Sequence, residues 1–190
     1  MNHDEARARI LDAAETLFYD RGIQSVGMDE LRAAAGVSLK RLYGCFPAKQ
    51  DLVEAYLRRR DDRWRTALAG YVTQRAEAPG ARPLAVFDWL HDWFSGPDFR
   101  GCAFVNSFGE LGATSDGVAR IARAHKRALR AYLTDLVRDA GSAEPDVLGV
   151  QLALLVDGAI TTAAIAGEPS AARQARSAAA ALLTAGAAGR

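Results

Sequence analysis

Apolar residues recur along most of the chain with the three- and four-residue spacing of amphipathic helices. The alternation of apolar and polar residues that is typical of strands is nearly absent. The pattern therefore predicts an all-α protein. The expected helices cover residues 6–19, 28–35, 39–46, 49–71, 84–94, 104–111, 118–140, 145–166 and 170–183.

The second and third of these helices are short, and the residues around them are typical of helix ends. Gly27 precedes the second helix as a tolerable N-cap, and Gly36 closes it. Ser38 is a good N-cap for the third helix, which Pro47 ends because the residue before a proline is pushed out of helical geometry. Since such short helices are unstable alone, we expect both to pack against their neighbours.

Length and turn chemistry together indicate two regions. A chain of 190 residues can build one large core, or a small domain joined to a larger one. We expect a small domain over residues 1–48 and a larger one over residues 49–190, connected by the helix over about 49–71. The most plausible seam in the chain is the turn-rich stretch 76–83 (AEAPGARP).

Composition disfavours several classes of protein. Cys45 and Cys102 are far apart and form no CxxC pair, so neither a disulfide scaffold nor a metal site is predicted. His3, His91 and His125 are scattered and no phosphate-binding loop is visible, so an enzyme is the least favoured class and no cofactor is expected. The charged N-terminus and the lack of a run of roughly 18 apolar residues predict a soluble, cytoplasmic protein without a membrane span.

The net charge of +1 argues at first against a nucleic-acid partner, but the charge is unevenly distributed. Residues 1–35 hold four arginines and seven acidic residues, whereas residues 36–65 hold eight Lys and Arg and four acidic residues. Positive charge therefore collects from the third predicted helix onward, as DNA binding requires. The arginines of residues 58–65 are interleaved with Asp61 and Asp62, and we interpret them as a solvated helix face.

Residues 28–46 combine a short helix, a turn that contains Gly36, and a second short helix rich in hydrogen-bond donors. Two helices joined by a glycine turn are typical of the helix-turn-helix, whose second helix enters the major groove of DNA. The spacing alone fits plain bundle packing equally well, because many small helical proteins contain such a pair. The local positive charge favours DNA binding.

The segment ARARILDAAETLFYDRGIQSVGMDELRAAAGVSLKRLYGCFPAKQDLVEAYL, residues 6–57, resembles the N-terminal DNA-binding domain of the TetR/AcrR family of transcriptional regulators. Its specific features are ILDAAETLF, the AAGVS turn, LY followed by F, and a Lys before the fourth helix. The resemblance implies a homodimeric repressor that binds a palindromic operator in double-stranded DNA. It also implies release when a small hydrophobic effector occupies the C-terminal domain. An activator, or an interaction module that does not bind DNA, is the alternative on the same fold.

The resemblance places the reading surface on the third helix. The two cations of this helix face the DNA, where either can donate two hydrogen bonds to O6 and N7 of guanine. Ser38, Tyr43 and Lys49 are placed for phosphates, and the ring of Tyr43 fits packing on the first helix as well. The chain departs from the family pattern at Gly27, where threonine is usual, and at Gly44, where a larger residue is usual, and both departures predict weaker contacts. The predicted DNA-binding residues are Gly27, Ser38, Leu39, Lys40, Arg41, Tyr43, Gly44 and Lys49.

Aromatic residues are concentrated between Phe87 and Phe108, in greater number than the packing of two helices needs. Because ligand sites are mostly apolar cavities with a few polar groups, this window predicts an effector pocket. A simple aromatic core is the alternative for each ring, and each polar candidate fits a surface or core position equally well. The predicted effector-binding residues are Trp89, Trp93, Phe94, Phe104, Asn106, Phe108, Glu110, His125 and Asp157.

The last two predicted helices are apolar on more than one face and must be buried by something. In the TetR/AcrR family these helices form the dimer interface, so the resemblance implies that they pair with a second copy of the chain. The predicted interface residues are Leu148, Leu152, Leu155, Ala159, Ile160, Ala163, Ala175, Ala179 and Leu182.

Overall fold

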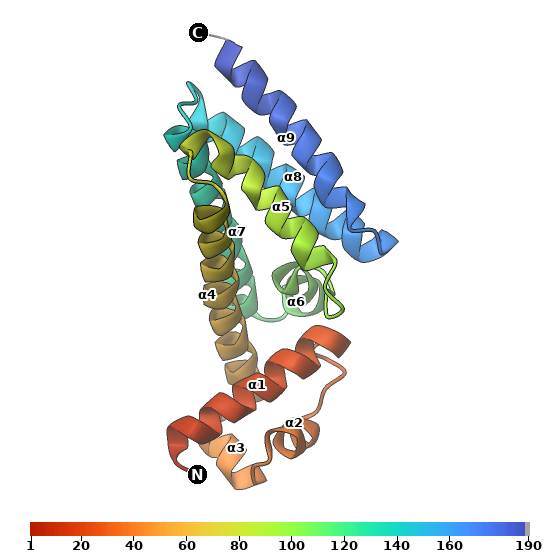
Figure 1. The fold of residues 1–190 in the computed structure, drawn as a ribbon. Coiled ribbons are helices and arrows are strands. Elements are labelled where there is room, and N and C mark those ends of the chain that lie inside the picture. The colour runs from red at the N-terminus through yellow and green to blue at the C-terminus, as the bar shows by residue number, and fades with distance from the viewer. Residues whose placement is uncertain (189–190) are drawn as a thin grey trace. The chain divides into compact units, whose positions relative to one another are not determined.

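The computed structural model describes residues 1–188, with side chains as far as residue 185, and the described part contains helices but no strands. The all-α prediction is confirmed. Figure 1 shows α1 (His3–Arg21), α2 (Met28–Ala35), α3 (Leu39–Cys45), α4 (Lys49–Arg75), the 3-10 turn η1 (Pro79–Ala81), α5 (Arg82–Phe94), α6 (Ala103–Leu111), α7 (Asp116–Asp139), α8 (Pro145–Ala166) and α9 (Ser170–Ala188).

The helix ends follow the predicted chemistry at the two short helices. Gly36 closes α2 in the left-handed conformation, with φ of 65°, which costs a glycine nothing. The Ser38 hydroxyl accepts a hydrogen bond from the backbone N–H of Arg41 at 3.2 Å and so caps α3. Gly27 occupies the N-cap of α2, where it has no side chain to accept such a bond.

The chain divides into two compact units, and the division does not follow the chain in order. The first unit contains residues 1–63 and 103–124, and the second contains residues 64–102 together with the chain from residue 125 onward. Helix α4 contributes its first half to the first unit and its second half to the other. The predicted boundary after residue 48 therefore lies inside the first unit.

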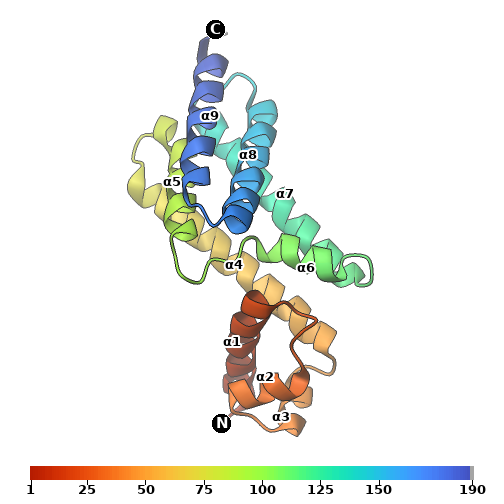
Figure 2. The ribbon, with the colours of Figure 1, turned by 90° about the vertical axis from the view of Figure 1, so that its right-hand side faces the viewer.

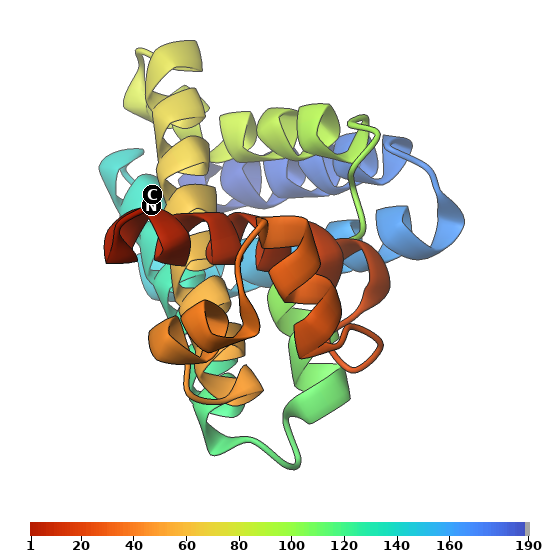
Figure 3. The same cartoon turned by 90° about the horizontal axis from the view of Figure 1, so that it is seen from below.

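In the first unit, α2 and α3 lie against α1 (Figure 3). The core side chains between these helices are fully or almost fully buried, and they include Ile10, Leu31, Leu42 and Phe46. The ring of Phe18 from α1 meets the ring of Tyr56 from α4 edge to face, with 5.6 Å between centroids. Apolar packing thus fixes the two short helices, which are unstable in isolation.

In the second unit, α8 and α9 run side by side in opposite directions and α5 packs on α9 (Figures 1 and 2). Small residues of α9 allow this close approach, since Ala172 and Ala179 are fully buried. Leu152 and Val156 supply the matching buried positions of α8.

Helix α8 is the one helix of the described residues that is long and apolar enough to cross a membrane, judged by length and composition alone. Its mean hydropathy over an 18-residue window is 1.7, a value that the core helix of a soluble protein also reaches, so it is weak evidence for a membrane span. The helix also carries Asp146 and Asp157 and buries its row from Leu148 to Ala163 inside the unit. A core helix has the same properties.

Candidate nucleic-acid interface

Helix α3 buries one narrow stripe and presents the rest of its surface to solvent. Leu42 is fully buried, whereas Leu39 and Tyr43 are 42% and 44% exposed. Lys40 and Arg41 are also exposed beside them. These four side chains form the exposed row of α3, which comprises Leu39, Lys40, Arg41 and Tyr43. The last three carry hydrogen-bond donors that face solvent.

The turn between α2 and α3 is closed by backbone hydrogen bonds. The N–H of Gly36 donates to the carbonyl of Ala33 at 3.1 Å, and the N–H of Val37 donates to the carbonyl of Arg32 at 3.0 Å. The angle between the two short helices is therefore set by the main chain and not by exposed side chains.

The N-terminal residues pack against α3, a contact that periodicity could not indicate. Arg41 donates from Nη2 to the carbonyl of Met1 at 3.4 Å, and the Sγ of Cys45 lies 3.8 Å from Nδ1 of His3. The guanidinium of Arg7 lies 4.5 Å above the ring of Phe46. The start of the chain thus borders the exposed row of α3.

Lys49, predicted to contact phosphate, is held by the loop between α1 and α2. Its Nζ donates to the carbonyl of Ile23 at 2.6 Å. Burial lowers the pKa of the Lys49 ammonium, and the neighbouring Glu110 carboxylate partly offsets the shift. A phosphate contact by Lys49 stays a prediction, and the structure adds a role in positioning the loop.

Glu110 of α6, predicted to contact the effector, binds the same loop. Its carboxylate accepts hydrogen bonds from the backbone N–H of Ile23 at 3.0 Å and of Gln24 at 2.8 Å. The side chain of Gln24 donates to the Glu110 carbonyl at 2.9 Å. Because charge-assisted bonds to backbone N–H groups are among the stronger ones, this carboxylate is engaged within the first unit.

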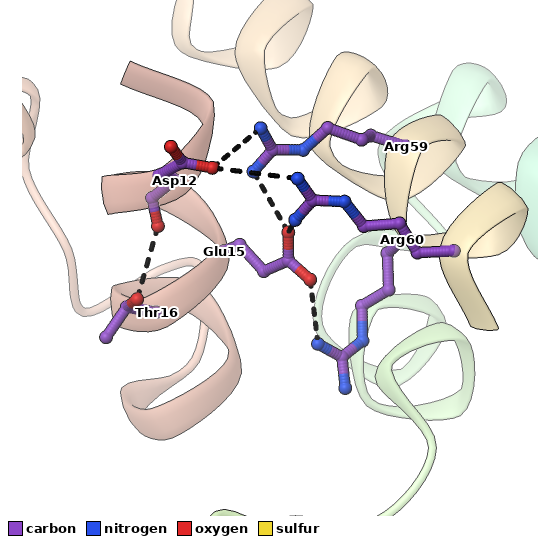
Figure 4. Close-up of polar contacts among 6 residues, drawn as sticks. Asp12, Glu15, Thr16, Arg59 and Arg60 are labelled. Atoms are coloured by element: carbon purple, nitrogen blue, oxygen red, sulfur yellow. Dashed lines mark hydrogen bonds and ion pairs between the residues drawn. The ribbon is translucent and has the colours of Figure 1, made fainter. Parts of the chain in front are cut away.

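Three arginines of α4 converge on two carboxylates of α1 (Figure 4). Glu15 accepts from Arg59 at 2.9 Å, from Arg60 at 3.3 Å and from Arg63 at 2.8 Å. Asp12 adds a second ion pair to Arg59 at 2.9 Å. The interpretation of this segment as a solvated helix face is wrong for Arg59 and Arg60, whose side chains are mostly covered by α1.

In the second unit, the predicted aromatic residues of α5 form a cluster that also includes Trp64 of α4. The ring centroids of Trp64 lie 5.0 Å from those of Trp89 and 5.9 Å from those of Trp93, and Trp89 stacks on Trp93 at 5.4 Å. Phe94 tilts against Trp93 at 5.8 Å. The sequence window missed Trp64 because this residue lies on an earlier helix.

The remaining predicted effector residues are divided between the units. His125 is buried in the second unit with its ring 5.2 Å from that of Trp64, and Asp157 accepts a hydrogen bond from Lys126 at 2.5 Å. The α6 candidates belong to the first unit, where the ring of Phe104 is buried, Phe108 is exposed and Asn106 is exposed. The structure therefore brings His125 together with the tryptophans and assigns the α6 residues to the other unit.

The predicted dimer residues lie mainly inside the subunit. Seven of them are buried within one chain: Leu148, Leu152, Ala159, Ile160, Ala163, Ala175 and Ala179. Leu155 and Leu182 are half-buried. The exposed apolar residues of α8 are instead Val147, Val150, Leu154 and Ile165. The predicted apolar face thus packs on α9 and α5 of the same chain, and the assignment of these residues to a dimer interface stays a prediction.

Comparison with known proteins gives two kinds of similarity. The family model described as "Bacterial regulatory proteins, tetR family" matches residues 10–56. The HTH-type transcriptional activator FasR of Mycolicibacterium smegmatis is 46% identical over 59 residues, which make up 31% of this chain. The match spans only 27% of FasR, about a quarter of that relative's length.

Two solved structures match over almost the whole chain. A TetR-family transcriptional regulator from Streptomyces coelicolor is 31% identical, with 96% of both chains covered and a TM-score of 0.88. A protein from Streptomyces avermitilis, described as a TetR transcriptional regulator, is 30% identical over 92% of this chain and 97% of its own, with a TM-score of 0.74. With the helix-turn-helix and the exposed row of α3 in place, the chain belongs to the TetR family of transcriptional regulators.

Proposed function

We propose that the protein is a ligand-responsive repressor that binds a palindromic operator in double-stranded DNA as a homodimer in the cytoplasm. The observation that carries the proposal is the exposed row of α3, in which Lys40 and Arg41 stand free of carboxylate partners among the described residues. Other cations of the first unit have partners within the chain: Arg59 pairs with Glu15, and Lys49 donates to the carbonyl of Ile23. Unpaired cations on a rigid helix are what groove recognition needs.

Each exposed side chain of α3 has a chemical role in this proposal. Lys40 and Arg41 donate to O6 and N7 of guanine, the commonest specific contact in the major groove. Leu39 offers an apolar surface to a thymine methyl group. Tyr43 and the N-terminal end of α3 at Ser38 bind phosphates and thereby fix the register of the helix on the duplex.

Dimerisation in this proposal uses the outward face of α8. Val147, Val150, Leu154 and Ile165 recur at helical spacing, and Leu154 and Ile165 are 67% and 83% exposed. An exposed apolar row of this kind is unusual on a monomer, and a two-fold axis buries it against its own copy. Once the helix-turn-helix of one subunit is bound, the helix-turn-helix of the other subunit meets the second half-site at high effective concentration. This compensates for the small number of contacts that each subunit makes.

The effector in this proposal is a small hydrophobic molecule that binds beside the tryptophan cluster. Trp64, Trp89 and Trp93 are each half-buried, so part of each side chain is open to solvent. Trp64 also lines a cavity of about 230 Å³ together with Leu68 and Tyr132. Aromatic walls with a few polar groups are typical of ligand sites.

Activation is the second candidate function, and the name of FasR as an activator favours it. The same head can repress or activate, because the outcome depends on where the operator lies relative to the promoter. The two candidates make the same prediction for DNA binding.

Electrophoretic mobility shift on the DNA upstream of the protein's own gene tests the proposal. We expect a specific shift that weakens steeply as the salt concentration rises, since phosphate contacts release counterions. Binding that does not depend on sequence, or the absence of a shift by a correctly folded dimer, would contradict the proposed function. A reporter gene under the same promoter separates repression from activation.

A further inference from the structure

The second unit contains an open pocket that none of the roles above uses. It lies where the end of α4, the turn η1, α5 and the first half of α9 meet, and its volume is about 570 Å³. It shares no residue with the tryptophan cluster or with the exposed face of α8. Its lining residues are Tyr71, Arg75, Ala76, Ala81, Ala85, Asp88, His91, Asp92, Arg173 and Arg176.

Positive charge exceeds negative charge in this pocket. Three arginines and two aspartates line it, and one pair is already neutralised, because Nε of Arg176 lies 2.8 Å from a carboxylate oxygen of Asp88. Arg75 and Arg173 form no ion pair with any carboxylate of the described residues. Asp92 accepts a hydrogen bond from the hydroxyl of Tyr71 at 3.0 Å, which satisfies part of its charge. Two guanidinium groups therefore remain without an anionic partner.

The two unpaired guanidinium groups are held in place by uncharged neighbours. Arg75 lies over the ring of Tyr71, with 5.5 Å between its Cζ and the ring centroid. Arg173 contacts Nε2 of His91, which must accept because a guanidinium only donates. The other ring nitrogen of His91 lies 3.3 Å from the hydroxyl of Ser95, which completes the support on α5. These contacts orient the cations without neutralising them.

We propose that this pocket binds an organic anion, a carboxylate attached to a flat apolar body. Arg75 and Arg173 donate charge-assisted hydrogen bonds to the carboxylate, for which the planar guanidinium is well suited. The apolar body lies against the ring of Tyr71 and the methyl groups of Ala76 and Ala85, whose small size leaves the space open.

The hydroxyl of Tyr71 keeps the wall of the pocket compatible with an anion. The pKa of Tyr71 is raised, first by burial and then by its hydrogen bond to Asp92, so the phenol stays protonated at neutral pH. It therefore continues to donate to Asp92 and adds no negative charge of its own. The pocket retains a net positive lining under ordinary conditions.

Isothermal titration of the full-length protein at low ionic strength tests the proposal, with benzoate as the probe and benzamide as its neutral isostere. We expect benzoate to bind at least tenfold more tightly than benzamide, since only benzoate carries the charge that the guanidinium groups complement. Arg75→Gln and Arg173→Gln should each weaken benzoate binding by about tenfold, because each removes a charge but keeps a donor.

Arg130→Gln is the matched control, since Arg130 is an exposed arginine on α7 outside the pocket. It should bind benzoate with the wild-type affinity, and all variants should melt at the same temperature as the parent. Equal binding of benzoate and benzamide would overturn the proposal, as would unchanged affinity in both pocket variants. Binding of inorganic phosphate as tightly as benzoate would also overturn it, because the apolar wall would then contribute nothing. An unaltered operator affinity in the same variants separates this site from DNA binding.

Discussion

The two compact units of the chain differ in where their cations without a carboxylate partner lie. In the first unit, Glu15 gathers three arginines, and Lys49 and Glu110 both bind backbone groups of one loop. In the second unit, Arg75 and Arg173 line an open pocket without carboxylate partners among the described residues. In the described part of the chain, the first unit presents its unpaired cations Lys40 and Arg41 on an exposed helix, and the second places Arg75 and Arg173 in an open pocket.

The match to the family model is confined to one of the two units. The family model covers residues 10–56, all of them in the first unit. B-form DNA presents a constant groove geometry, so a head that reads it must hold its helices in one arrangement. Effectors differ in shape and charge, and a unit that binds them is free to vary. This difference explains why the family model matches residues 10–56 and does not extend into the second unit.

The largest effect is expected from Leu154→Glu, on the exposed face of α8. If that face forms the dimer interface, the change places two carboxylates in a buried apolar contact, which costs several kcal/mol. The dimer dissociation constant should then rise by at least about 100-fold. Sedimentation velocity over a concentration series measures the change.

Leu39→Glu is the control for this experiment in the other unit. Leu39 is also an exposed leucine, but it stands on α3, where an added carboxylate repels phosphate. It should abolish operator binding and leave the dimer intact. A dimer that is unchanged by Leu154→Glu would show that the interface does not include the exposed face of α8.

A smaller effect is expected from Glu15→Gln, which tests whether the first unit depends on its charge cluster. The change keeps the size of the side chain but removes the shared partner of Arg59, Arg60 and Arg63. Because the first two arginines are mostly covered, we expect a loss of about 1–3 kcal/mol in the free energy of unfolding, measured by urea denaturation.

Asp29→Asn is the matched control, since Asp29 pairs with Arg32 at 2.7 Å on the exposed surface of α2. Its cost should stay below about 1 kcal/mol, as is typical of exposed ion pairs. If the two variants lose the same free energy of unfolding, then the cluster at Glu15 is an ordinary surface network.

The smallest effect is expected from Gly27→Thr, which restores the side chain that is usual in the family. A Cβ at Gly27 would meet no atom within 4 Å, and the backbone is extended there, so the new side chain fits. Its hydroxyl can cap α2 and contact a phosphate, and we expect operator affinity to rise by roughly threefold. Fluorescence anisotropy measures the affinity. Gly27→Ala adds the methyl group without the hydroxyl and should bind as the parent does; equal gains in both variants would exclude a hydroxyl contact.

The sequence predicted the parts of the fold that depend on neighbouring residues. Gly36, Ser38 and the apolar spacing determine α2 and α3 locally, and the structure confirms all three features. The hydrogen bonds of Glu110 to Ile23 and Gln24 join residues that lie 87 and 86 positions apart, and no local pattern encodes such a pairing.

The two apolar faces of α8 show a second limit of periodicity. Helix α8 is apolar on both sides, so its spacing could not decide which row packs on α9 and which row remains exposed. The residues predicted for the dimer interface fall on the buried row from Leu148 to Ala163. Trp64 was missed for a related reason, since only the fold brings it to Trp89 and Trp93.

Binding of a fluorescent operator duplex by the Lys40→Ala, Arg41→Ala double variant tests the central claim most directly. Each base contact is worth about 1–3 kcal/mol, and the dimer carries two heads, so the double variant should lose at least about 100-fold in operator affinity. Sedimentation should show that it remains a dimer, and its melting temperature should match that of the parent. A folded, dimeric double variant that binds the operator with the parent's affinity would contradict the assignment of α3 as the reading helix.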